Sequence, residues 1–311
     1  MSLVDRVLDP LAVVPPDTRL LTATTKAGID FFERRAQGET VDAEDLALAS
    51  VTRYVARRMG LTDPGLNISA ACASGTLAVG KAAALIVAGL ADAVLVVCVD
   101  QVTAFALAGF SALKALSPDP CRPFDRHRRG LSLGEGAAAL VLMSRQYARR
   151  YRRPFKGRIL GWGAANDATH MTAPDRRGRG LIQAIRQALA VARRQPADIG
   201  AINAHGTGTI YNDQMELVAF GSLFGRRPKG VFSIKGAIGH CLGAAGGIET
   251  VIGLEALRRQ TLPPTVGCAD PEPAAALWVR PAVQPFDGHC LLSTNSGFGG
   301  VNSAVIIGDE S

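Results

Sequence analysis

The sequence has few features of a secreted or membrane-bound protein. No apolar segment reaches the roughly 18 to 20 residues that a transmembrane helix requires, and the first residues lack the basic and apolar regions of a secretory signal. Six cysteines stand without CxxC spacing, which argues against a disulfide framework and against paired zinc ligands. They are Cys72, Cys98, Cys121, Cys241, Cys268 and Cys290. These absences predict a reduced, cytoplasmic protein with no metal site and no membrane span.

Acidic residues are fewer than basic residues, 27 against 34, and aromatic residues are scarce. The formal charge is +7, only 5% of the residues are aromatic, and the arginines cluster at 122–129, 145–158 and 176–179. Nucleic acid is one possible partner for such a surface. The clusters nevertheless lack the interleaved aromatic side chains of a base-stacking platform, so we do not expect a nucleic-acid partner. A solvated face is an equally fair interpretation of any single arginine.

What the chain does contain is material for a large core and a repeated pattern. Hydrophobic residues make up 48% of 311 residues, enough for one large core or two fused halves without disulfides. A pattern of strand, helix and strand occurs over 67–143 and again over 155–307. The apolar runs 93–99 and 137–143 are typical of buried strands in a sheet covered on both faces. We therefore predict an α/β fold.

One cysteine stands at a position that favours chemistry. In the segment 67–76, an apolar strand-like stretch gives way to small residues around Cys72 and then to a long alanine-rich helix. Unpaired backbone amides and the helix dipole favour a thiolate at such a position, which predicts a lowered thiol pKa and a nucleophilic sulfur. A buried, inert cysteine is the alternative.

Two histidines follow glycine-loosened segments far downstream. His205 comes just after the short apolar run 199–202, and His240 comes just before a predicted helix over 242–257. Lys235 lies five residues before His240. Taken alone, each histidine is as well explained as a hydrogen-bonded turn residue.

In order and spacing, these segments resemble the β-ketoacyl synthases, the condensing enzymes of fatty acid and polyketide assembly. The resemblance runs from about Thr18 to Ile307. It implies a thiolase-like layered αβαβα fold of two related halves, with residues 1–146 carrying the nucleophile and residues 147–311 carrying both histidines. The motifs are Ala71-Cys-Ala-Ser-Gly75, Arg122-Pro-Phe-Asp125 with Leu133-Gly-Glu-Gly136, Asp167-Ala-Thr-His-Met-Thr172, Asn203-Ala-His-Gly-Thr-Gly-Thr209, Lys235 with Gly239-His240, and Gly297-Phe-Gly-Gly300.

The resemblance also implies a division of labour. Cys72 would accept an acyl chain from the phosphopantetheine arm of an acyl carrier protein, and no other cofactor is expected. His205 and His240 would stabilise the charge that develops on a malonyl thioester as it loses carbon dioxide. Initiating synthases carry asparagine where His240 stands, so the Cys-His-His set resembles the elongating class.

Three further residues are expected to support the catalytic set. Lys235 matches the family lysine near the second histidine, and Glu216 matches the acid expected to pair with it, although a structural ion pair explains both equally well. The backbone amides of Cys72 and Phe298 would form an oxyanion hole, and the Phe298 side chain would gate the acyl pocket.

The substrate channel is expected to involve two hydroxyls and two aromatic side chains. Thr207 and Thr209 match the residues that hydrogen-bond the pantetheine amides, with ordinary loop capping as the alternative. Phe105 and Phe110, in the alanine-rich segment 102–116, are expected to line the acyl pocket.

The chain departs from the family pattern in three places. Ser296 stands where the family has phenylalanine, which predicts a smaller and more polar floor for the gating loop, and Arg129 replaces an acid. Only 17 residues precede Thr18, where the family has a first strand-helix unit. We expect this unit to be missing or replaced, with residues 4–14 either a shortened substitute or outside the sheet.

The resemblance implies partners as well as chemistry. The arginine clusters would attract the acidic recognition helix of the carrier protein. Strands near 67–71 would pair across a dimer, either between two copies or with a related synthase subunit. Two other functions stay open: a non-elongating accessory subunit, although such subunits generally lack the cysteine, and an acyltransferase that uses Cys72 without decarboxylation.

Overall fold

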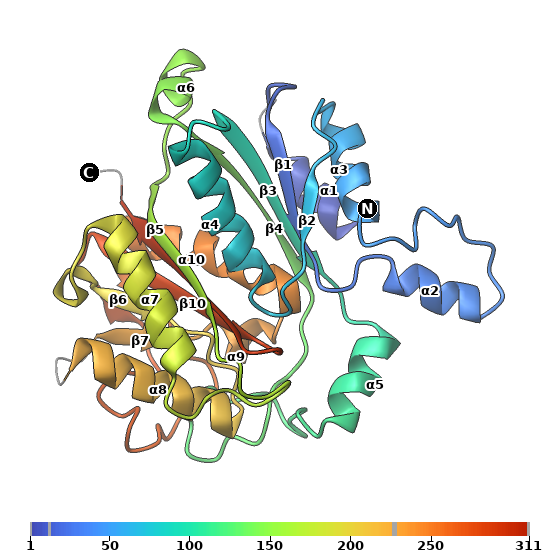
Figure 1. Cartoon of the computed structure of the whole chain (residues 1–311). Coiled ribbons are helices and arrows are strands. Elements are labelled where there is room, and N and C mark those ends of the chain that lie inside the picture. Colours follow the sequence, from blue (N-terminus) through green and yellow to red (C-terminus); the bar gives the residue numbers. More distant parts are fainter. Residues whose placement is uncertain (1, 12–13, 226–228, 310–311) are drawn as a thin grey trace.

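The computed structural model describes residues 2–11, 14–225 and 229–309. Its two large sheets are separated by a pair of helices (Figure 1), and a third sheet has only two short strands. These helices, α4 (Ser74–Val87) and α10 (Ala245–Arg259), contact each other and both sheets. Further helices cover the outer face of each sheet, so the order of layers is αβαβα. The predicted thiolase-like fold class is confirmed.

The first sheet has four strands in the order β2-β1-β3-β4. Strand β1 (Arg19–Ala23) pairs in parallel with β2 (Leu66–Ile68) and with β3 (Ala93–Asp100), whereas β4 (Gly136–Met143) is antiparallel to β3. Every residue of β3 is buried, as expected for a valine-rich central strand covered on both faces. The strands predicted at 93–99 and 137–143 are therefore confirmed.

The second sheet has five strands in the order β5-β11-β10-β6-β7. Four of these strands repeat the pairing of the first sheet. Strand β6 is parallel to β7 and β10, as β1 is to β2 and β3, and β11 is antiparallel to β10, as β4 is to β3. The fifth strand, β5, pairs antiparallel with β11. The bounds are β5 Arg158–Asn166, β6 Ala201–Asn203, β7 Gly230–Phe232, β10 Cys290–Gly297 and β11 Val301–Gly308.

No described strand takes the position next to β4 that β5 occupies next to β11. Instead, helix α1 (Leu3–Leu8) buries Val4 and Leu8 against the outer face of β3 and β4. The expected substitute for the first strand-helix unit is thus a helix that packs on the sheet without entering it. Of residues 4–14, 12 and 13 lie outside the described part.

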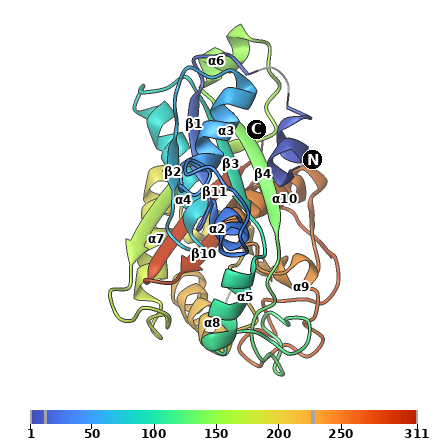
Figure 2. The same ribbon diagram turned by 90° about the vertical axis from the view of Figure 1, so that its right-hand side faces the viewer.

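The remaining helices complete the outer layers. Helix α3 (Ser50–Met59) covers the first sheet beside α1, and α7 (Arg179–Ala192) and α8 (Ile210–Phe224) cover the second. Helices α2 (Ile29–Ala36) and α5 (Ala104–Ala112) project to one side of both sheets (Figures 1 and 2). The short elements are α6 Arg145–Arg150, α9 Lys235–Ile238, the 3-10 turns η1 Pro196–Asp198 and η2 Leu242–Ala244, and strands β8 Thr261–Leu262 and β9 Gln284–Pro285.

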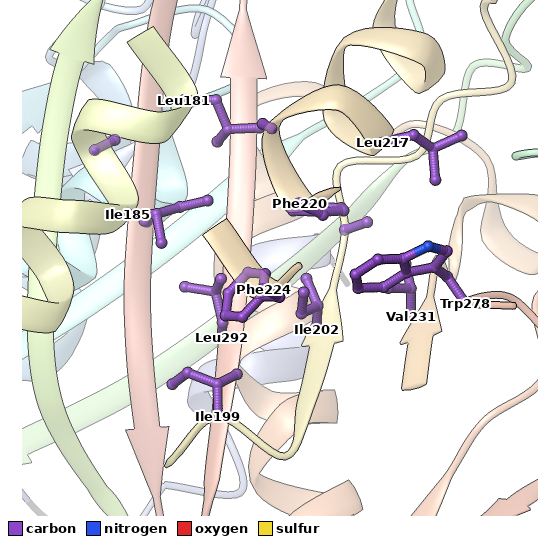
Figure 3. Close-up of a cluster of buried hydrophobic side chains, with 14 of the residues drawn as sticks. Leu181, Ile185, Ile199, Ile202, Leu217, Phe220, Phe224, Val231, Trp278 and Leu292 are labelled. Atoms are coloured by element: carbon purple, nitrogen blue, oxygen red, sulfur yellow. The ribbon is translucent and has the colours of Figure 1, made fainter. Parts of the chain in front are cut away.

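Large apolar side chains fix the outer helices on the second sheet (Figure 3). Leu181 and Ile185 of α7 and Phe220 of α8 are fully buried against Ile202 and Leu292 of the sheet. Burying one such side chain contributes roughly 1.5 to 3 kcal/mol to the free energy of unfolding. This packing holds β6 and β10, from whose ends the site is built, in fixed positions.

Small residues allow the two central helices to approach each other closely. A Cβ atom added at Gly75 of α4 would lie 2.7 Å from the backbone nitrogen of Gly247 in α10 and 2.8 Å from the carbonyl oxygen of Gly243. Only glycine fits at this contact, since real Cβ atoms do not approach backbone atoms so closely. The contact brings the start of α4, after Cys72, next to the segment that follows His240.

The helix predicted over 242–257 begins with the 3-10 turn η2 and continues as α10 to Arg259. Among the described residues, we find no helix both long enough and apolar enough to cross a bilayer.

Candidate active site

Cys72, His205 and His240 come from three distant segments and meet in space. Cys72 occupies the turn between β2 and α4, His205 follows β6, and His240 follows α9. The cysteine sulfur and one nitrogen of each ring all lie within 4.8 Å of one another. The two rings stand edge to face, with centroids 5.1 Å apart. The structure therefore brings together the three side chains that the sequence singled out.

A cavity of about 370 Å³ reaches all three side chains. Its wall also includes Thr207, Thr209 and Phe298. Exposed side chains such as Met171 and Tyr211 lie on the same wall, so the cavity connects the buried sulfur to the surface. A flexible substrate arm can reach Cys72 by this route.

The turn that holds Cys72 is conformationally constrained. Ala71 has a φ of 48°, in the left-handed region that residues with a Cβ seldom adopt. The end of β10 runs against this turn, because a Cβ added at Gly297 would lie 3.1 Å from the backbone nitrogen of Cys72. The backbone of Phe298, the next residue, is thereby held beside Cys72. Their joint use as an oxyanion hole stays a prediction.

The pKa expected for Cys72 is wrong in direction. Burial raises the pKa of the thiol to about 12, and the nearby charge of Lys235 opposes this only in part. Loss of solvation at this residue, which is 6% exposed, is the largest cause of the raised pKa. The resting site therefore holds a neutral thiol.

Both histidines are neutral as well. Burial, with the positive charge of Lys235, lowers the pKa of His205 and of His240 well below 6.5. A neutral imidazole has one N–H donor and one acceptor nitrogen. Each ring can therefore donate a hydrogen bond to a developing negative charge while it remains neutral.

Lys235 pairs with a residue that the sequence analysis missed. Its ammonium group forms an ion pair with Glu249 of α10, and both side chains are about 1% exposed. The expected partner, Glu216, is wrong: no ion pair joins it to Lys235. The available signal was position, since Glu249 is the one charged residue in the first turns of α10, where its neighbours are small or apolar.

Glu216 instead holds the loop that carries His205. Its carboxylate accepts hydrogen bonds from the backbone N–H groups of His205 and Gly206, each at 2.7 Å. Asp213, one turn earlier in α8, accepts from the N–H of Thr207 at 3.1 Å. Burial raises the pKa of Glu216 to about 8, and the neighbouring Asp213 adds to this. Helix α8 thus fixes the loop by two carboxylates.

Asn295 is a second residue that the sequence analysis missed. It lies on β10, is fully buried, and its side-chain nitrogen lies 3.0 Å from Nδ1 of His205 and 2.8 Å from Oε2 of Glu249. Its side-chain oxygen accepts a hydrogen bond from the hydroxyl of Thr76 in α4. It directly precedes the Ser296 position noted in the sequence, which was the available signal.

Only one of the two aromatic residues expected in the acyl pocket lines the cavity. Phe110 does so and stacks on Phe298, with ring centroids 5.7 Å apart. Phe105 is wrong: it is 61% exposed and is not part of the cavity wall. Five residues along an α-helix correspond to a rotation of roughly 140°, so the two side chains of α5 face different directions.

The other expected channel residues lie on the cavity wall. The hydroxyls of Thr207 and Thr209 are 2.9 Å apart and bond to each other, so loop capping and substrate binding are both open to them. Ser296 donates to Asn302 at 2.7 Å, and Arg129 forms an ion pair with Asp119. The small Ser296 side chain leaves open space beside the Phe298 turn.

Within the described part of the chain, Cys72, His205 and His240 also form the one cluster of potential metal ligands. The expectation that the site works without a metal stays a prediction.

Models of the two domains of β-ketoacyl synthases match most of the chain. The N-terminal domain model matches residues 29–148, and the C-terminal domain model matches residues 156–269. The predicted division at residue 146 stays a prediction.

The chain is also similar to curated proteins from several bacteria. It is 37% identical to the tetracenomycin polyketide synthase ketoacyl synthase alpha subunit of Streptomyces glaucescens, over 98% of this chain and 78% of that protein. It is 40% identical to putative polyketide beta-ketoacyl synthase 1 of Streptomyces cyaneus, over 81% of this chain and 62% of that protein. It is 35% identical to 3-oxoacyl-[acyl-carrier-protein] synthase 2 of Staphylococcus aureus, over 82% and 66%. The matches thus span 62 to 78% of these relatives' lengths.

Solved structures agree with this similarity. The ishigamide ketosynthase/chain length factor superposes with a TM-score of 0.89 at 30% identity, covering 98% of this chain and 78% of that chain. A type II polyketide acyl carrier protein in complex with its ketosynthase bound to the hexaketide gives a TM-score of 0.86 at 26% identity, covering 95% and 78%. Motifs, fold and similarity agree, and the chain belongs to the β-ketoacyl synthase family.

Proposed function

We propose that the protein is a condensing enzyme that joins an acyl chain held on Cys72 to a malonyl unit delivered by an acyl carrier protein. The observation that supports this best is the convergence of one thiol and two neutral imidazoles at the inner end of one cavity. A nucleophile and two N–H donors are the groups that acyl transfer and decarboxylation require.

In the first half-reaction, the sulfur of Cys72 attacks the thioester carbonyl carbon of the acyl carrier protein. A new carbon–sulfur bond forms, the bond to the carrier sulfur breaks, and the thiol proton passes to the leaving sulfur by way of a neutral imidazole. A proton acceptor is needed because burial raises the pKa of the thiol to about 12. Both imidazoles have a ring nitrogen within 4.8 Å of the sulfur.

In the second half-reaction, a malonyl thioester takes the place of the departed carrier. Its carbon–carboxylate bond breaks, carbon dioxide leaves, and the electron pair forms an enolate whose oxygen accepts N–H bonds from His205 and His240. One such donor is worth about 10²- to 10³-fold in rate. The enolate carbon then bonds to the acyl carbon, the bond to Cys72 breaks, and the thiolate takes up a proton from water that enters through the cavity.

The phosphopantetheine arm would be supplied by the carrier and not held as a resident cofactor. The cavity is its proposed channel, with the hydroxyls of Thr207 and Thr209 on the wall to bond its amides. The formal charge of +7 favours an acidic carrier. A similar protein has been solved as a ketosynthase in complex with an acyl carrier protein, which supports the same partner here.

A dimer is proposed through the edge strand β2. Among the described strands, β2 has a neighbour on one side only, β1, so its other edge offers backbone groups for pairing. A second copy of this chain is the proposed partner, and a related chain length factor is the alternative, as in the ishigamide complex. Sedimentation of the purified chain as a monomer at micromolar concentration would rule out the homodimer.

Incubation with a carrier protein that bears a radiolabelled acyl chain, together with malonyl carrier protein, tests the function. Release of carbon dioxide with a longer product supports the synthase, whereas acyl transfer alone indicates the acyltransferase. Absence of label on Cys72 indicates the accessory subunit. Cys72→Ala should abolish labelling, and Cys268→Ala is a matched control, because Cys268 is equally buried but lies in the core under the second sheet.

A further inference from the structure

The side chain of Asn295 connects the ion pair of the site to one of the two histidines. Its nitrogen donates to Oε2 of Glu249 at 2.8 Å and lies 3.0 Å from Nδ1 of His205. Its oxygen accepts from the hydroxyl of Thr76. An amide nitrogen has two hydrogens and no acceptor capacity. Both contacts of the nitrogen are therefore donations by Asn295.

The neighbours of Asn295 permit only this orientation of its amide. In the opposite orientation, the amide oxygen would face a carboxylate oxygen of Glu249 at about the same distance, which places two acceptors together without a hydrogen. Glu249 is held in place by its ion pair with Lys235. All of these groups are buried, so water cannot relieve a wrong orientation.

A fixed amide determines where the proton of the neutral His205 ring resides. Because Nδ1 accepts from Asn295, the single ring hydrogen must be on Nε2. Asn295 is not part of the cavity wall, whereas His205 is. The nitrogen left to face the cavity is thus Nε2, and it carries the hydrogen.

His240 is not constrained in this way. Its Nδ1 is buried and has no hydrogen-bond partner among the described residues. The two rings, which face each other edge to face, therefore differ in how their tautomers are set. A perturbation of Asn295 should affect one ring and spare the other.

We propose that Asn295 is a positioning residue. The ion pair of Lys235 and Glu249 holds its amide in place, and the amide fixes the Nε2–H tautomer of His205, which presents an N–H donor to the thioester oxygen. Its role in the reaction rests on the proposed condensing function. The tautomer itself follows from the hydrogen bonds alone and can be measured separately.

The test combines nitrogen NMR with a decarboxylation assay on the full chain. Histidine labelled with ¹⁵N gives different signals for protonated and unprotonated ring nitrogens, and His205→Gln and His240→Gln assign the two buried rings. We expect wild-type His205 to show an unprotonated Nδ1 and a protonated Nε2. A protonated Nδ1 in the wild type would overturn the proposal without any variant.

Asn295→Asp combined with Glu249→Gln reverses the hydrogen bond, because the carboxylate then at position 295 can only accept from Nδ1, and the amide then at position 249 can donate to it. We expect the His205 signals to show a protonated Nδ1, the His240 signals to stay unchanged, and release of carbon dioxide from malonyl carrier protein to fall about 100-fold. Ser293→Ala is the matched control. It removes a buried hydroxyl without a partner from the same strand and should change neither readout.

Two results with this double variant would contradict the proposal: an unchanged His205 tautomer, or a switched tautomer with an undiminished rate of decarboxylation. If the wild-type protein releases no carbon dioxide at all, the proposed condensing function fails, while the wild-type NMR signals still decide the tautomer. The two ideas therefore fail by different observations.

Discussion

Glu249 offers a sharp test because it neutralises a lysine that has no access to water. Glu249→Gln keeps the shape of the side chain but leaves the ammonium group of Lys235, about 1% exposed, without its counter-charge. Removing one partner of a buried ion pair costs about 3 to 5 kcal/mol. At roughly 2.1 cal/mol/K of unfolding entropy per residue, this cost lowers the melting temperature of a chain of this size by about 5 to 8 °C.

The assay is thermal unfolding of the purified protein, with Glu255→Gln as the control. Glu255 lies six residues further along the same helix, where it pairs with Arg258 and Arg259 at the surface, and its loss should have no measurable effect on stability. The double variant Lys235→Met with Glu249→Leu should recover most of the lost stability without recovering decarboxylation. A melting temperature of Glu249→Gln within a degree of wild type would refute this reasoning.

Three further predictions concern the thiol, the aromatic pair and the central helices. Alkylation of Cys72 by iodoacetamide should accelerate about tenfold per pH unit from pH 7 to 9, because a thiol with a pKa of about 12 gains thiolate throughout that range. A rate that levels off near neutral pH would instead show that the resting thiol is ionised. Phe110→Ala should alter the range of acyl chains loaded, since Phe110 lines the cavity, whereas Phe105→Ala should not, since Phe105 is exposed. Mass spectrometry of the acylated protein measures the chains loaded, and equal effects of the two variants would contradict the pocket assignment. Gly75→Ala should destabilise the fold by about 1 to 3 kcal/mol, because the added carbon meets the backbone of α10. Gly221→Ala, where the added carbon meets no other atom, should stabilise the fold by about 0.5 to 1 kcal/mol. Urea titration measures both changes in the free energy of unfolding.

The residues that sequence analysis found are those whose local context was distinctive. Cys72, His205 and His240 each stand where an apolar run ends among small residues, and that pattern survives in a single sequence. A sheet covered on both faces was predictable for a similar reason, since uninterrupted apolar runs such as that of β3 require it, whereas the αβαβα layering was implied by the family resemblance.

The misses arose where an interaction depends on distance in space alone. Glu216 and Glu249 both lie on helices at plausible separations from Lys235, and only the fold shows that Glu249 is the partner. The only local signal for Asn295 was its place before Ser296, and this does not reveal its role, which depends on neighbours from α4, from α10 and from the loop after β6. The thiol pKa was mistaken because the helix dipole can be inferred from sequence, whereas the depth of burial cannot.

The most direct test of the central claim is a single turnover with the chain already acylated on Cys72. Malonyl carrier protein is added, and carbon dioxide and the carrier-bound product are measured together by mass spectrometry. We expect one carbon dioxide released for each acyl group lost from Cys72, and a product two carbons longer. Return of the acyl group to the carrier unextended, with no carbon dioxide released, would contradict the assignment of Cys72, His205 and His240 to one condensation site.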